Sequence, residues 1–237
     1  KPKKYDEKRQ KVIFRPLHSA DLLDQITAVA MLNMLIYDYD DNNVISMSNL
    51  SRLIPHNFYG NRVAYEPEKL FKPWQEQYKE YTTQANEYYK HYHENGEYKW
   101  EANLDLKNFF PSINPICLYN YVFQQMPVNY SETEKSIFGK ILEKLIFVEI
   151  ECCDKSDLAM YLEDNKFDYC RFAMGLPQGL PQSYFLANLF MVEIEKIYRT
   201  VLPGKMVFYV DDSIIFTNAI KDIDDFEEKI KKINTSI

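Results

Sequence analysis

Two adjacent carboxylates, Asp211 and Asp212, end a Tyr-Val-Asp-Asp tetrapeptide at 209–212 that lies between two short apolar runs. Apolar runs separated by a short polar segment predict a β-hairpin, which places both carboxylates at its tip. Like charges held a few ångströms apart raise the pKa of at least one of the two groups. A bound divalent cation removes that cost, because it becomes the largest charge in the site. The alternative is an ordinary solvated turn.

A third carboxylate, Asp105, lies near the end of a stretch that alternates apolar and polar residues from Trp100 to Leu106. The alternation predicts a β-strand, which ends before Pro111. If this strand lies beside the hairpin, the three carboxylates form an oxygen cage that suits Mg²⁺, or Mn²⁺ in its place. Two such ions would hold the attacking and leaving oxygens of an in-line phosphoryl transfer. A simple strand-end aspartate is the alternative for Asp105.

A loop rich in glycine and proline, at 175–182, separates these two regions and contains Gln178 and Gly179. Glycine and proline at this density indicate a turn whose backbone approaches another segment closely. Ser183 follows as a candidate N-cap for a long apolar helix. A turn that merely precedes a helix is the alternative, but the order of the three segments along the chain argues for a shared site.

In this order, the three segments resemble the palm motifs of reverse transcriptases. The matching features are Asp105 with an aromatic residue five positions later, the Pro-Gln-Gly loop with its following Ser and Ala-Asn, and the Tyr-Val-Asp-Asp hairpin. The Arg-Pro-Leu sequence at 15–17, with Asp24 and Gln25 downstream, is similar to the first fingers segment of those enzymes. The resemblance spans about residues 8–217 and is nearest to bacterial lineages: retron, group II intron and abortive-infection enzymes.

The resemblance implies a role for each matching residue. Asp105, Asp211 and Asp212 would be the catalytic, metal-binding carboxylates. The backbone carbonyl of Leu106 would be a further metal ligand, and Tyr209 would touch the end of the primer. The residues that would line the site of the incoming nucleotide and its triphosphate are Lys11, Arg15, Asn108, Phe109, Phe110, Gln178 and Gly179.

Phe110 bears on the choice among polymerases. At this position, the resemblance implies a steric gate, an aromatic ring that lies under the sugar and leaves no room for a 2′-hydroxyl. RNA-dependent RNA polymerases have a similar palm but generally carry an acidic residue here. The aromatic residue therefore favours DNA synthesis, and an ordinary core phenylalanine beside Phe109 is the alternative.

The composition is that of a folded globular protein without a membrane anchor. The chain has 237 residues with 46% hydrophobic content, which is enough for one large core or two modest ones. No apolar run approaches the ~20 residues of a membrane helix. The four cysteines have no CxxC spacing, so we interpret them as reduced thiols of a cytoplasmic protein. The four histidines form no credible site.

The net charge of −7 is unusual for a protein that binds a polyanion. Residues 1–15 hold seven Lys and Arg against two acidic residues, so the remainder of the chain is strongly acidic. This basic N-terminal arm could grip a nucleic-acid strand by releasing counterions. A solvated tail is an equally good interpretation.

The resemblance and the element pattern together predict an α+β fold with the fingers and palm of a right-hand polymerase, its antiparallel palm sheet backed by helices. We assign 1–98 to the fingers region and 99–237 to the palm, with a fingers insertion near 146–174, and we find no thumb. A tyrosine-rich helix could stack bases or simply pack. The predicted helices are 20–37, 67–95, 115–126, 131–145 and 183–201, and the predicted strands are 99–106 and a hairpin at 205–217.

The sequence therefore predicts a reverse-transcriptase-type DNA polymerase, RNA-directed or untemplated, that adds dNTPs by two-metal phosphoryl transfer. The resemblance implies a role in bacterial antiphage defence, dNTPs and an RNA or DNA strand as partners, and two further features of abortive-infection relatives: priming from a protein tyrosine and homo-oligomers. Two alternatives stay open. One is a silent palm kept as an assembly scaffold, and the other is an RNA-dependent RNA polymerase.

Overall fold

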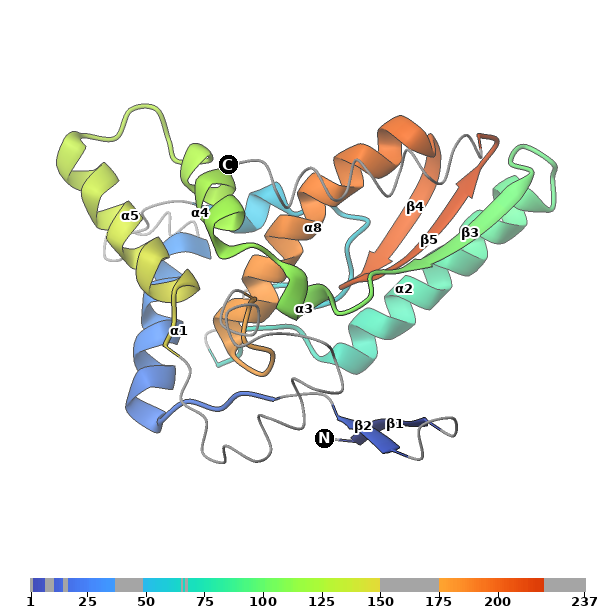
Figure 1. Ribbon diagram of the computed structural model, residues 1–237. Helices are drawn as coiled ribbons and strands as arrows, with labels where there is room; N and C mark the ends of the chain where they lie inside the picture. Colours follow the sequence, from blue (N-terminus) through green and yellow to red (C-terminus); the bar gives the residue numbers. More distant parts are fainter. Residues whose placement is uncertain are drawn as a thin grey trace.

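The computed structural model gives a mixed α and β chain built around one small sheet (Figure 1). It describes residues 2–6, 11–14, 17–36, 49–64, 66, 68–149 and 175–219. Arg15 and most of the predicted insertion at 146–174 lie outside these described residues. Within the described ranges, no helix has both the length and the apolar character needed to cross a membrane.

The sheet has three antiparallel strands in the order β3-β5-β4. A two-residue turn joins β4 to β5, and the strand that carries Asp105 pairs with β5 rather than with β4. The predicted strand and hairpin are therefore confirmed, and the middle strand is the one that begins at Asp212. The bounds are β3 Trp100–Asp105, β4 Gly204–Tyr209 and β5 Asp212–Thr217.

Helices cover both faces of this sheet, with α8 on one side and α2 on the other (Figure 1). Side chains alternate along β4, so Phe208 stacks on Tyr198 of α8 while Val207 packs against Tyr81 of α2. This alternation follows from the two-residue period of a strand. The bounds are α2 Trp74–Tyr88 and α8 Pro181–Val201.

The main core surrounds α8, which is buried over most of its length. Three further helices pack around it, each with fully buried side chains such as Leu35, Leu118 and Phe138. Local signals start two of them: Asn114 accepts backbone hydrogen bonds at the start of α4, and Ser131 forms a capping box with Glu134 at the start of α5. The bounds are α1 Leu22–Ile36, α4 Pro115–Gln124 and α5 Glu132–Ile146.

Helix α2 is shorter than predicted, because it starts after Pro73 rather than at residue 67. Proline is tolerated at a helix start and excluded from its interior. The helix then continues into a π-helical turn, η2 (Tyr89–His93). Tyr81 is 6% exposed and packs on the sheet, so packing is the role that the structure gives this tyrosine.

Four small elements complete the described chain. The N-terminal arm forms a two-stranded hairpin, β1 (Pro2–Asp6) with β2 (Lys11–Phe14). A 3₁₀ turn, η1 (Leu50–Leu53), precedes the segment 54–64, and α3 (Phe109–Ser112) follows β3. Segment 54–64 extends the sheet briefly, since Phe58 forms a parallel bridge with Phe208 of β4.

Candidate active site

A row of three side chains crosses the end of the sheet. Asp105 of β3 lies directly opposite Asp212 of β5, and Tyr209 of β4 lies opposite Asp212 on its other side. Directly opposed residues project to the same face, with Cβ atoms about 4.5–5.5 Å apart. The pairing thus brings Asp105 and Asp212 together, although 106 residues separate them along the chain. Asp211 lies next to them in the turn.

The electrostatics of the row show how closely these groups lie. Partial burial raises the pKa of the Asp212 carboxyl, and the nearby Asp105 carboxylate raises it further. Across the gap to α2, burial, Asp212 and Tyr78 together raise the pKa of Tyr81 to about 12. The carboxylates therefore face α2, on the same side of the sheet as Tyr209.

The donor set suits a hard divalent cation. Paired carboxylates that repel each other gain from a cation between them, and oxygen ligands are what Mg²⁺ prefers. In the part of the chain that the structure describes, however, no three His, Cys, Asp or Glu side chains are grouped closely enough to hold a metal ion. What the fold brings together is the pair Asp105 and Asp212, with Asp211 one residue away. Leu106, the predicted carbonyl ligand, directly follows β3.

The turn that carries Asp211 is strained. Val210 has φ of 59°, and a β-branched residue is a true outlier in this left-handed region. Such strain persists only where surrounding structure imposes it. The two-residue hairpin turn requires a positive φ at its first central residue, and Gly60 leaves room for Val210 there, because a Cβ on Gly60 would lie 2.6 Å from Val210 Cγ2 and 2.9 Å from the Val210 nitrogen. Only glycine allows this close approach.

A buried asparagine fixes the backbone that meets the turn. Asn188, which is 0% exposed, donates from Nδ2 to the carbonyl of Gly60 at 2.6 Å and to that of Asn61 at 3.3 Å. A buried amide without these acceptors would lose a substantial part of its hydrogen bonding. The Ala-Asn pair of the sequence pattern therefore connects helix α8 to the aspartate hairpin through segment 60–61.

The Pro-Gln-Gly loop is attached to the segment that follows Asp105. The Leu176 amide donates to the Phe110 carbonyl at 2.8 Å. Gly175 lies so close to Pro111 that a Cβ there would be 2.4 Å from the Pro111 Cα. The close backbone approach predicted from glycine and proline is confirmed, and it places the loop beside α3.

His18 is a contact that sequence reasoning missed. Its amide donates to the Gln178 carbonyl at 2.8 Å, and its Nδ1 lies 3.2 Å from the same oxygen. Gly179 has φ of +116°, and a Cβ there would be 2.5 Å from the His18 carbonyl oxygen. Burial lowers the pKa of His18, against the opposing effect of its bond to Gln178. The only available signal was its position one residue after the Arg-Pro-Leu sequence.

Comparison with known families decides what this arrangement is. Residues 31–237 match the model of the family described as reverse transcriptase (RNA-dependent DNA polymerase). The chain belongs to the reverse transcriptase family. No curated protein is similar enough to the chain to count as a match.

Membership settles the fold and the class of reaction. This reverse transcriptase has the fingers and palm fold predicted from the sequence, with mixed helices and a small antiparallel sheet. It is an RNA-directed DNA polymerase, a nucleotidyltransferase that acts on nucleotide and nucleic-acid substrates. The family match does not assign individual residues, so their roles come from the local geometry.

The remaining predicted residues of the reverse transcriptase site occupy varied positions. Phe110 is 6% exposed and makes edge contacts with Phe109 and Tyr184 at 5.7 Å each, so core packing is well supported for this ring and the steric gate stays a prediction. Asn108 has φ of 55° and precedes α3. Lys11 begins β2 at the N-terminal hairpin.

Tyr209 is packed rather than open. Its ring contacts Tyr78 edge-on at 5.3 Å and Tyr81 at 5.6 Å. Burial is the main cause of its raised pKa, with Tyr78 as a second cause. Helix α2 thus sits directly beside the predicted primer contact, and Tyr78, which is 49% exposed, borders the carboxylate row.

Proposed function

We propose that Asp105, Asp211 and Asp212 are the metal-binding carboxylates of this polymerase. The observation that carries the proposal is the register of β3 and β5, which sets Asp105 opposite Asp212 at the hairpin tip. The strained Val210 and its contact with Gly60 add support, because a costly backbone conformation is retained beside these groups. The Leu106 carbonyl is a fourth candidate ligand.

The proposed chemistry is transfer of a deoxynucleotide to a 3′-hydroxyl. The 3′-hydroxyl loses its proton to water, its oxygen bonds to the α-phosphorus of a dNTP, the bond from that phosphorus to the α,β-bridging oxygen breaks, and pyrophosphate leaves. Two Mg²⁺ ions, or Mn²⁺, would lower the charge on the attacking and leaving oxygens when bound. The role of the chain is mainly to position the reacting groups, as in other phosphoryl transfers.

We assign the nucleotide to the space bordered by α3 and the Pro-Gln-Gly loop. The Phe110 carbonyl and the Leu176 amide join these two segments, and His18 holds the carbonyl of Gln178. Backbone amides of Asn108 and Phe109 would meet the triphosphate. The other proposed contacts are Gln178, Gly179, Lys11, Arg15 and, at the primer end, Tyr209.

The biological setting is also a proposal. Support for a bacterial defence enzyme comes from the motif resemblance to retron, group II intron and abortive-infection enzymes. From the same resemblance we also propose untemplated or tyrosine-primed synthesis, a homo-oligomer and a cytoplasmic location. Light scattering at micromolar concentration tests the oligomer, because a monomer there would contradict it. A silent scaffold is disfavoured by the carboxylate pair, which is repulsive unless it binds a cation.

The test is dNTP incorporation by the full protein with Mg²⁺, with and without an RNA template. We expect Asp211→Asn to lower incorporation by at least about 1,000-fold, because a removed metal ligand affects the transition state directly. Glu101→Gln is the matched control, since Glu101 is an exposed acid on β3, four residues before Asp105. Normal synthesis by a folded Asp211→Asn protein would refute the catalytic assignment.

A further inference from the structure

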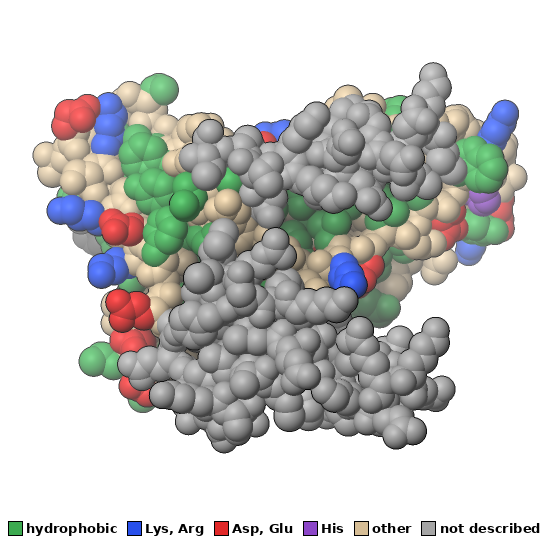
Figure 2. Space-filling view, viewed as in Figure 1, with side chains coloured by type: hydrophobic (Ala, Val, Ile, Leu, Met, Phe, Trp, Pro, Cys, Tyr) green, Lys and Arg blue, Asp and Glu red, His purple; other side chains and the backbone are tan. Residues whose placement is uncertain are grey.

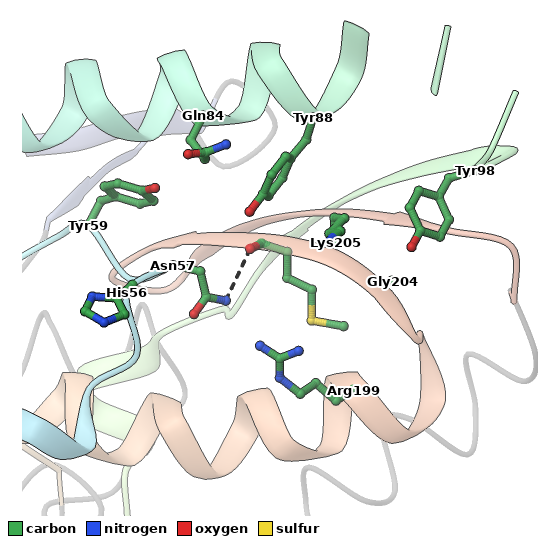
Figure 3. Close-up of a pocket in the computed structure, with 10 residues that line it drawn as sticks. His56, Asn57, Tyr59, Gln84, Tyr88, Tyr98, Arg199, Gly204 and Lys205 are labelled. Atoms are coloured by element: carbon green, nitrogen blue, oxygen red, sulfur yellow. Dashed lines mark hydrogen bonds between the residues drawn. The ribbon is translucent and has the colours of Figure 1, made fainter. Parts of the chain in front are cut away.

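A polar pocket lies at the far end of β4 from the hairpin. Its volume is about 460 Å³, which is within the usual range of small-ligand sites. Figure 3 shows Gln84 and Tyr88 entering it from α2 and Arg199 from α8 on the opposite side. The lining residues are His56, Asn57, Tyr59, Gln84, Tyr88, Tyr98, Arg199, Gly204, Lys205 and Met206.

The pocket forms where segment 54–64 no longer pairs with the edge of β4. Segment 54–64 pairs with β4 only around Phe208, whose amide donates to the Asn57 carbonyl at 2.9 Å. Further along the edge, the Asn57 side chain replaces the backbone pairing and donates from Nδ2 to the Met206 carbonyl at 3.2 Å (Figure 3). Backbone groups alternate between the two sides of a strand. Those of Gly204 therefore face the pocket.

The charge of the lining is positive in a chain of net charge −7. Arg199 and Lys205 contribute cations, and no Asp or Glu is among the ten lining residues. Arg199 also pairs with Glu195, but a guanidinium has five donors, more than one carboxylate oxygen can accept. Elsewhere the described charges are mixed: over α5, acidic and basic side chains lie side by side, and Lys135 pairs with Glu132 (Figure 2).

Aromatic rings supply the remaining recognition surface. Tyr59, Tyr88 and Tyr98 come from three separate segments and line the same space. Lys205 is held near them, with Nζ 5.1 Å from the centroid of the Tyr92 ring. Tyr92 belongs to the π-helical turn η2, a feature that is frequent at functional sites. Cations beside tyrosine rings are the combination that binds single nucleotides and single strands.

We propose that this pocket binds one nucleotide unit, with its phosphate at Arg199 and Lys205 and its base against Tyr88 or Tyr98. The β4 residues of the lining, Gly204 to Met206, lie roughly 10–17 Å along the strand from Tyr209, at the spacing of strand residues, and none of the three proposed metal-binding carboxylates lines the pocket. Its volume accommodates a single nucleotide and excludes a duplex. The nucleotide is either free or part of a single strand, and the proposal does not depend on the catalytic assignment.

The probes are AMP and the oligonucleotide dA6, measured by their affinity for the full protein in EDTA, which removes metal-dependent binding at the carboxylates. We expect Tyr88→Leu and Tyr98→Leu each to weaken binding by about 10-fold, the effect of losing one stacked base. Lys205→Gln should lower the slope of log affinity against log salt for dA6 by about 0.7, the loss of one phosphate contact. Equal affinity for both probes identifies a free nucleotide, and binding of dA6 alone identifies a strand.

Matched controls are Trp100→Leu, an exposed ring outside the lining, and Lys140→Gln, an exposed cation on α5. Both should bind like the wild type. Photocrosslinking with 8-azido-AMP should label the peptides that contain Tyr88 or Tyr98. The same peptides should be labelled in the Asp211→Asn protein. Absence of binding by both probes would overturn the proposal. Unchanged affinity in the folded Tyr88→Leu, Tyr98→Leu and Lys205→Gln proteins would also overturn it. A pocket that binds a peptide strand would give this result.

Discussion

The two ends of strand β4 differ in how closely they are packed and in the charge of the side chains around them. At the Tyr209 end, the backbone is closely packed: Gly60 touches Val210, and Asn188 fixes the segment that makes this contact. At the Gly204 end, the covering segment has turned away and leaves a pocket of about 460 Å³. The first end collects carboxylates, and the second collects cations and tyrosine rings.

The difference teaches how one short strand can serve two kinds of binding. Metal chemistry needs groups fixed within a fraction of an ångström, and the hairpin end achieves this through a strained turn with a glycine contact. Recognition of a flexible anionic ligand needs open donors and ring faces instead. The two sites are separated along β4 rather than by its faces, because Lys205 and Tyr209 project to the same side of the sheet.

Sugar selectivity should belong to the hairpin end alone. If Phe110 is the steric gate, Phe110→Ala should reduce the preference for dNTPs over rNTPs by roughly 100-fold, a few kcal/mol of lost steric exclusion. Competing incorporation of the two substrates measures this ratio. Tyr88→Leu, at the pocket end, should leave the ratio unchanged. Because Phe110 is buried, thermal unfolding must confirm that the variant is folded, and an unchanged ratio in a folded variant assigns Phe110 to the core.

The contact between Gly60 and Val210 should matter for turnover. In Gly60→Ala, the new Cβ displaces the Val210 backbone, and we expect kcat to fall between about 10- and 100-fold, since small misplacements of reacting groups have effects of this size. The KM for dNTP should change much less. Asn57→Ala is the control on the same segment at the pocket end, and its kcat should stay near wild type. Equal kcat values for the two variants would remove the contrast between the ends.

Acid should weaken the attachment of the Pro-Gln-Gly loop through His18, and we expect this to be the smallest of the three effects. Burial lowers the pKa of His18 below its ordinary value of 6.5, so the unfolded chain binds the proton more readily. The stability from neutral His18 is complete above pH 6.5 and is lost as the pH falls through the lower, folded pKa. Thermal unfolding at pH 7.5 and 5.5 should show a larger decrease for wild type than for His18→Gln. His91→Gln, an exposed histidine on η2, should behave like wild type, and an identical decrease in all three proteins would contradict the role of His18.

Much of the architecture followed from local patterns. Alternation predicted β3 and the hairpin, and long apolar periodicity predicted α8, because these signals depend on burial of one face. The spacing of Asp105, Gln178 and Asp211 predicted a common site, and register then placed Asp105 opposite Asp212. The start of α2 was predicted seven residues too early, since Pro73 was given too little weight.

Other features were beyond prediction because they depend on contacts between distant segments. Nothing near Gly60 in the sequence indicates a contact with Val210, 150 residues later. The sequence around Asn188 likewise does not indicate its hydrogen bond to the Gly60 carbonyl. His18 was dismissed with the other histidines, although it holds Gln178. The pocket also escaped notice, because its lining comes from four separate stretches of the chain.

The free edge of β4 has one more consequence, for solubility. An exposed edge strand is a template for pairing with another copy of the chain, and proteins block such edges with charge or with short covering segments. Here Phe58 covers the edge at Phe208, near the hairpin, the Asn57 side chain occupies the Met206 carbonyl, and Lys205 adds a charge at the open end. A second copy that extended the sheet would meet an occupied acceptor and a cation, so we expect these residues to disfavour pairing of β4 with another chain.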